Sequence, residues 1–70
     1  MNAALLKYHV QLRGKTLAKL ANYLNISEST LHRKMRGDSD FFRSEIIGIS
    51  EFCELSPLDV RKIFFEDNIA

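Results

Sequence analysis

At 70 residues with 46% hydrophobic and 27% charged side chains, the chain has the composition of one small globular domain, residues 1–70, and not of a disordered segment. Its formal net charge of +1 excludes no partner by itself, because the charge is unevenly distributed. Residues 1–36 contain seven Lys and Arg and one acid, whereas residues 37–70 contain three Lys and Arg and eight acids, so only the first half suits a polyanionic partner.

The opening residues predict an amphipathic helix from about residue 2 to residue 13. They contain neither Pro nor Gly, and Leu6 and Val10 lie four residues apart, which places them on one face. Asn2 is expected to cap the helix and Gly14 to end it. Tyr8 is expected at the edge of the core, and His9 as a partly exposed residue, since no acid stands near it in the sequence.

Residues 16–37 predict two short helices joined by a tight turn. Thr16 caps the first, residues 17–24, whose apolar side chains share one face: Leu17, Leu20, Ala21 and Leu24. Residues 25–27 interrupt this period. Ser27 then caps a third helix, residues 27–36, in which Leu31 and Met35 face inward. Gly37 stands where a helix C-terminus needs a positive φ.

This stretch resembles the helix-turn-helix of the Cro and phage-repressor (XRE-like) family of DNA-binding proteins. That family has a small residue in the first helix, a turn residue four later and an apolar anchor six beyond that, and Ala21, Asn25 and Leu31 occupy these places. Asn25 stands where the family usually has Gly, and Asn tolerates the αL conformation that such a turn needs. Leu17 stands where the family often has a Gln that touches a phosphate, so that contact is not carried over.

The resemblance implies that the helix of residues 27–36 enters the major groove of DNA. At the matching positions, the side chains expected to read bases are Glu28, Ser29, His32 and Arg33. Arg33 can pair with guanine and Glu28 with cytosine, although an acid in the first turn also stabilises the helix dipole. The residues expected at phosphates are Thr16, Asn22, Ser27, Lys34, Arg36 and Arg43. The alternative is an ordinary solvated helix face.

Two more helices are predicted in the second half. Residues 43–54 form a helix with an inner face of Ile46, Ile49, Ser50 and Cys53, and Gly48 weakens it unless a backbone packs closely there. Ser56, Pro57 and Asp59 are the cap, the first-turn proline and the acid of a fifth helix. Core residues expected beyond the third helix are Phe41, Leu58, Ile63 and Phe64.

Enzymatic, metal-dependent and membrane functions find little support. The lone Cys53 excludes an internal disulfide and is expected to be a buried core residue, and His9 and His32 are too few for structural zinc. No nucleophile stands beside a base, and no phosphate loop is present. No apolar run approaches the roughly 18 residues that span a bilayer. We expect a soluble cytoplasmic protein with no metal, no cofactor and no catalytic activity.

The residues and the resemblance together predict an all-α, compact five-helix lambda-repressor-like DNA-binding domain with its helix-turn-helix at the second and third helices. Its expected function is that of a Cro-like transcriptional repressor that binds double-stranded DNA sequence-specifically. Because one module offers little interface, a homodimer on a palindromic operator is expected, with contacts from Ile47, Phe52 and Phe65. The alternative is a protein-interaction module, antirepressor or antitoxin-like, that binds another regulator; Leu17, Asp38 and Asp40 favour it.

Overall fold

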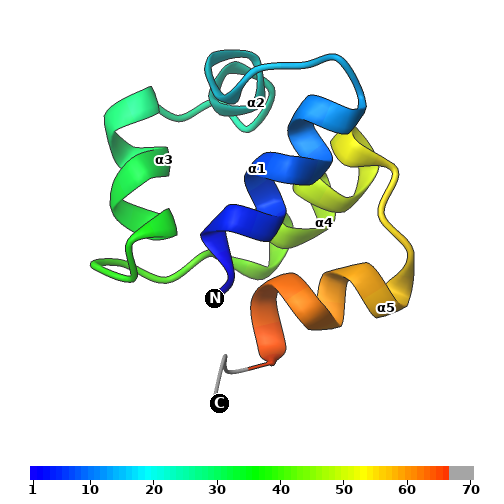
Figure 1. The fold of residues 1–70 in the computed structure, drawn as a ribbon. Coiled ribbons are helices and arrows are strands. Elements are labelled where there is room, and N and C mark those ends of the chain that lie inside the picture. The colour runs from blue at the N-terminus through cyan, green and yellow to red at the C-terminus, as the bar shows by residue number, and fades with distance from the viewer. Residues whose placement is uncertain (67–70) are drawn as a thin grey trace.

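Five helices follow one another along the chain: α1 (Ala3–Leu12), α2 (Leu17–Tyr23), α3 (Glu28–Met35), α4 (Arg43–Cys53) and α5 (Pro57–Val60), the last continued by a π-helical stretch, η1 (Arg61–Phe65). The computed structural model describes residues 1–66, and these contain no strand. α3 lies at one side of the molecule, α4 passes behind α1, and α5 lies along the lower edge (Figure 1). The radius of gyration, 11.0 Å, equals the about 11 Å expected of a compact 70-residue domain. The prediction of an all-α fold is confirmed.

Side-chain caps start four of the helices, as the sequence predicts. Each cap oxygen accepts a hydrogen bond from the backbone N–H three residues later, at 3.0 or 3.1 Å, and the caps are Asn2, Thr16, Ser27 and Ser56. α4 begins differently: Phe42 at its cap position has no side-chain acceptor, and Glu45 Oε1 instead accepts from the Phe42 N–H at 2.7 Å. The start of α4 therefore depends on a buried carboxylate.

Left-handed residues end three of the helices and set the turn between α2 and α3. Gly14 and Gly37 have φ values of 67° and 87° just after α1 and α3, and Asn25 has a φ of 60° in the turn, all as predicted. Glu54 also adopts a positive φ, 54°, at the end of α4. Because only glycine adopts this region without cost, Asn25 and Glu54 are sites where the fold imposes backbone strain.

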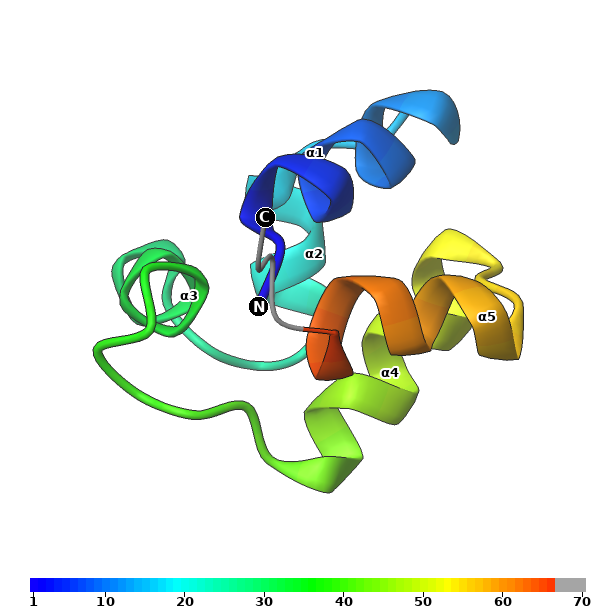
Figure 2. The ribbon, with the colours of Figure 1, turned by 60° about the horizontal axis from the view of Figure 1, so that its bottom comes forward.

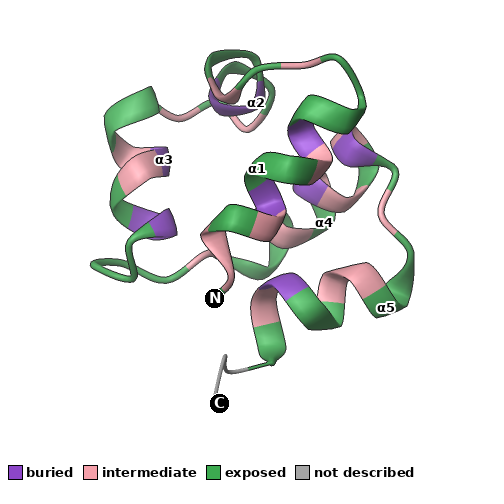
Figure 3. Cartoon of the chain, in the orientation of Figure 1, coloured by how far each residue is buried: buried purple, intermediate pink, exposed green. Residues whose placement is uncertain are grey.

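Within the described residues, α1 to α4 each bury side chains in one core, and Ile63 of η1 closes it, whereas α5 buries none (Figure 3). Nine apolar side chains are at most 5% exposed: Leu6, Val10, Leu20, Ala21, Leu31, Met35, Ile49, Cys53 and Ile63. Phe41 and Phe64 are partly buried against this core, and their rings meet edge to face with centroids 5.5 Å apart. The core therefore joins the inner side of α3 to the end of the described chain.

Several expectations for individual residues were wrong. Leu58 is 49% exposed and Tyr8 is 55% exposed, so neither belongs to the core. The close approach at Gly48 comes from a side chain, since a Cβ there would lie 2.8 Å from Cδ2 of Leu24. His9 has an acidic neighbour after all: its Nε2 lies 3.8 Å from Oδ1 of Asp59, which joins α1 to α5.

Viewed from below, α3 lies apart from α4 and α5, with the loop of residues 36–42 leading from α3 to α4 (Figure 2). Within residues 1–66, no helix has both the length and the apolar character needed to cross a bilayer.

Candidate nucleic-acid interface

The turn between α2 and α3 fixes the position of α3 through Ile26. The Ile26 N–H donates to the Ala21 carbonyl at 3.0 Å, and the Ile26 side chain packs against the core between the two helices. Leu31 and Met35 bury the inner side of α3, at 0% and 5% exposure. α3 is therefore held on one side only.

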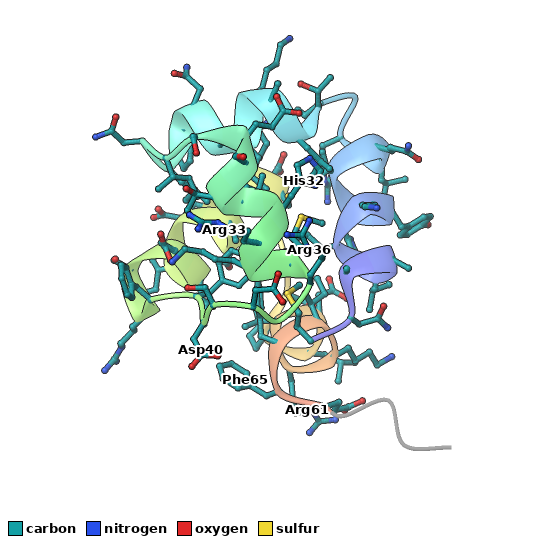
Figure 4. The ribbon with its side chains drawn as sticks, turned by 90° about the vertical axis from the view of Figure 1, so that its left-hand side faces the viewer. His32, Arg33, Arg36, Asp40, Arg61 and Phe65 are labelled. Atoms are coloured by element: carbon teal, nitrogen blue, oxygen red, sulfur yellow. The ribbon has the colours of Figure 1, made fainter. Side chains whose placement is uncertain are left out.

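The outer side of α3 carries polar and basic side chains. Ser29, Arg33 and Arg36 are exposed, and they follow one another at spacings of four and three, which places them on one helical face. Arg33 and Arg36 lie on this side of α3, and no other helix lies in front of it (Figure 4). The arrangement is that of a narrow, basic, unobstructed cylinder.

Glu28 and His32 lie at one edge of this face and pair with each other. Nε2 of His32 is 3.8 Å from Oε2 of Glu28, and the two side chains are 42% and 55% exposed. Glu28 also lines a hollow of about 320 Å³ together with Lys7, Lys15 and Thr16. Glu28 and His32 thus lie toward α1 and α2, whereas Ser29 and Arg33 project outward.

Thr30 is a residue that sequence reasoning missed. Its hydroxyl oxygen accepts from Nη2 of Arg33 at 3.3 Å, and it also forms a hydrogen bond of 2.9 Å with the hydroxyl of Ser27. The signal was available, because Ser27, Thr30 and Arg33 follow one another at a spacing of three along the helix. Thr30 therefore links the helix cap to the arginine of the exposed face.

The expectation that Lys34 contacts a phosphate was wrong. Lys34 is 5% exposed, and its Nζ donates to Oε1 of Glu45 at 2.9 Å and to the Asp40 carbonyl at 3.0 Å. The position lies beside Leu31 and Met35 on the inner face of α3, where its charge is satisfied by the protein itself. Its ammonium group is not available to a nucleic acid.

Other basic residues of the first half are also engaged internally. Nε of Arg13 donates to the Cys53 carbonyl at 3.0 Å, and Nζ of Lys15 donates to the Phe52 carbonyl at 2.8 Å, so both cations lie at the C-terminus of α4, where the helix dipole favours them. Arg36 pairs with Asp38 at 3.1 Å, although both remain exposed. The basic charge free on the surface is therefore smaller than the sequence indicates.

The other residues expected at phosphates or bases are accessible. Thr16, Asn22, Ser27 and Arg43 are exposed. Asn22 lies within α2, Ser27 caps α3, and Arg43 is the first residue of α4.

The three candidates for a contact between two copies differ in exposure. Ile47 is 51% exposed and Phe65 is 66% exposed. Phe52 is instead partly buried: its ring packs against Tyr23, with centroids 5.2 Å apart, and Lys15 Nζ lies 4.3 Å from its centroid. Phe52 is therefore less accessible to a second copy than Ile47 and Phe65 are.

Metal-ligating side chains and the lone cysteine were also compared with the expectations from the sequence. Among residues 1–66 no three His, Cys, Asp or Glu side chains come together in a way that could hold a metal ion. Burial raises the pKa of the Cys53 thiol, even though Lys15 and Arg13 lower it, so the thiol stays protonated at neutral pH.

Comparison with models of protein families, with characterised proteins and with solved structures finds no match to this chain.

Proposed function

We propose that this chain is a sequence-specific regulator that binds double-stranded DNA, of the phage-repressor type and cytoplasmic, with α2 and α3 as its helix-turn-helix and α3 in the major groove. The observation that carries the proposal is the outer face of α3. Ser29, Arg33 and Arg36 project there from a helix whose opposite side is anchored by Leu31 and Met35. A major groove about 12 Å wide admits such a helix.

Arg33 has the chemistry of the principal base-reading residue. Its guanidinium matches the two acceptors of a guanine edge, O6 and N7. The hydrogen bond that it donates to Thr30 limits the orientations of this side chain before it meets DNA. Ser29 is permissive, and the Glu28–His32 pair would read bases from the side of α3 that faces α1 and α2.

Phosphate contacts fall to exposed groups around α3. Arg36 must leave Asp38 to reach a phosphate, but an exposed ion pair is worth only about 0–1 kcal/mol, so the exchange costs little. The other candidates are Thr16, Asn22, Ser27 and Arg43. Because phosphates carry no sequence information, these residues position the protein and Arg33 selects the site.

Two copies bound to a palindromic operator would extend this small interface. Half-sites read by two-fold related helices lie about one helical turn, roughly 34 Å, apart. We propose a homodimer on DNA for this reason, and repression by occupying the operator.

Selection of bound sequences from a random duplex pool tests the proposal. The expected outcome is a two-fold symmetric consensus. In the selection, Arg33→Ala relaxes the preference at one base of each half-site. In binding titrations, Arg43→Ala weakens specific and random DNA alike. It also lowers the slope of log affinity against log salt concentration by about 0.9 for each phosphate that the variant no longer neutralises. If Arg33→Ala and Arg43→Ala reduce affinity equally on specific and random duplexes, Arg33 does not read bases.

A protein-binding role is the second candidate, and one observation favours it. Lys34 is buried in an ion pair, and the side chains of Arg13 and Lys15 donate to carbonyls at the end of α4. Fewer cations are therefore uncommitted than phosphate binding prefers. A fold of this kind also serves as a protein-interaction module. Retention on random duplex DNA at low salt separates the two functions, since a protein-binding module shows none.

A further inference from the structure

Beside the end of η1 the surface of the molecule is hollowed. The hollow has a volume of about 340 Å³, and its apolar walls are Met1, Phe41, Ile46, Phe64 and Phe65. A cavity of about 150 Å³ holds a benzene molecule, so this hollow has room for a phenyl ring. We call it the C-terminal hollow.

Phe65 is both part of this wall and the most exposed aromatic ring beside it. It is 66% exposed, whereas Phe64 next to it is partly buried and packs edge to face on Phe41. The same patch therefore carries a large apolar side chain in water and a hollow of suitable size, which the polar residues Lys34, Ser39 and Asp40 line together with the apolar walls. A patch that carries both is self-complementary across a two-fold axis, where each copy presents the same surface to the other.

The charges around Phe65 are also self-complementary across a two-fold axis. Asp40 lies on one side of Phe65 and Arg61 on the other (Figure 4). Asp40 contributes its backbone carbonyl to Lys34, and its carboxylate is exposed. Arg61 is 64% exposed, and its contact with Glu66, at 3.1 Å, uses Nε. An axis beside Phe65 exchanges the two sides and brings acid against base.

We propose that the C-terminal hollow is a two-fold self-association site, in which Phe65 of each copy enters the hollow of the other and Asp40 pairs with the partner's Arg61. Lys34 and Gly37, at the end of α3, also line the hollow, so the axis passes near the C-terminal ends of both α3 helices. The pairing of half-sites by this dimer rests on the proposed function, but the association itself needs no DNA.

Sedimentation equilibrium of the full chain without DNA, over a wide range of protein concentration, tests the site. The wild type forms dimers, and Phe65→Ser raises the dimer dissociation constant at least about tenfold, as for a central aromatic anchor. The matched control is Leu12→Ser, because Leu12 is also apolar and exposed, at 56%, but does not line the hollow. It leaves the dissociation constant unchanged.

A charge exchange provides the second, independent measurement. Asp40→Arg and Arg61→Asp each weaken the dimer, and the double variant recovers part of the loss, because acid and base again face each other across the axis. A wild type that stays monomeric at every concentration overturns the proposal, as does an equal loss in Leu12→Ser and Phe65→Ser, or a double variant no tighter than either single one.

The outcomes for the dimer and for the proposed function are separable. A dimer that depends on Phe65, in a chain that retains no duplex DNA, removes the proposed function and leaves this inference intact. Conversely, a monomer that selects a half-site sequence through Arg33 removes this inference alone.

Discussion

Lys34 on α3 and Glu45 on α4 form a buried ion pair, with Nζ and Oε1 2.9 Å apart and the two side chains 5% and 8% exposed. Nζ also lies 4.0 Å from the centroid of the Phe42 ring, and Oε1 accepts from the Phe42 N–H at 2.7 Å. These contacts join the end of α3, the loop of residues 36–42 and the start of α4. The pair therefore fixes where α3 lies relative to the rest of the molecule.

Lys34→Met is expected to destabilise the protein by about 3 kcal/mol, the cost of leaving one partner of a buried ion pair alone. Methionine keeps the apolar stem, so the loss reports on the charge. The free energy of unfolding measured in urea checks this. Lys19→Met is the control, because Lys19 is exposed on α2 and its replacement should change stability by no more than about 0.5 kcal/mol. Equal stabilities for the two variants would contradict the role given to Lys34.

Asn25 should respond to substitution through its backbone conformation. At a φ of 60°, Asn25→Ala is expected to cost about 1 kcal/mol, whereas Asn25→Gly is expected to be neutral or stabilising, because glycine has no Cβ to clash in this region. Asn22→Ala is the control: Asn22 lies within α2, where alanine is the better helix former. Thermal unfolding of the three variants checks the order. An Asn25→Ala variant as stable as Asn22→Ala would show that the turn carries no strain.

Asp59 predicts a specific dependence of stability on pH. Its pKa lies below the ordinary 3.8 because the backbone N–H of Ser56, and then the Ser56 side chain, favour the charged carboxylate. A lowered native pKa contributes stability that is present above the ordinary value and is lost as the pH falls through the native one. Asp59→Asn should therefore make the stability fall less steeply below about pH 4. Urea midpoints at a series of acidic pH values check this. Asn22→Ala, which removes no titratable group, should leave the acid decline unchanged.

Features that depend on neighbours in sequence were predictable here. The four side-chain caps act over three residues, and the turn at Asn25 and the end at Gly37 follow from single residue types. The apolar period likewise placed Leu31 and Met35 inward. Each of these depends on local geometry that the chain carries whatever its tertiary packing.

Contacts between helices were not predictable in this way. Lys34 and Glu45 are 11 residues apart, and Arg13 and Cys53 are 40 apart, so their pairing depends on how the helices pack. Lys34 was assigned to a phosphate together with Arg36, but Arg36 is exposed and Lys34 is buried. Successive side chains of a helix are rotated by about 100°. Basic residues on the same helix can therefore lie on opposite sides, one exposed and one buried.

Thr30 supplies the sharpest test of the candidate interface. Thr30→Val keeps the shape of the side chain but removes the oxygen that accepts from Arg33 at 3.3 Å. If Arg33 reads a base from a restricted orientation, this variant loses discrimination at the base that Arg33 contacts. The loss is at most the about 1–3 kcal/mol that one bidentate pair supplies, which is roughly 5- to 150-fold in affinity. Its salt slope stays that of the wild type, because no phosphate contact changes. Thr30→Ser keeps the hydroxyl and should keep the preference. A Thr30→Val variant with unchanged discrimination but lower stability would mean that the Ser27–Thr30–Arg33 hydrogen bonds serve only to stabilise α3.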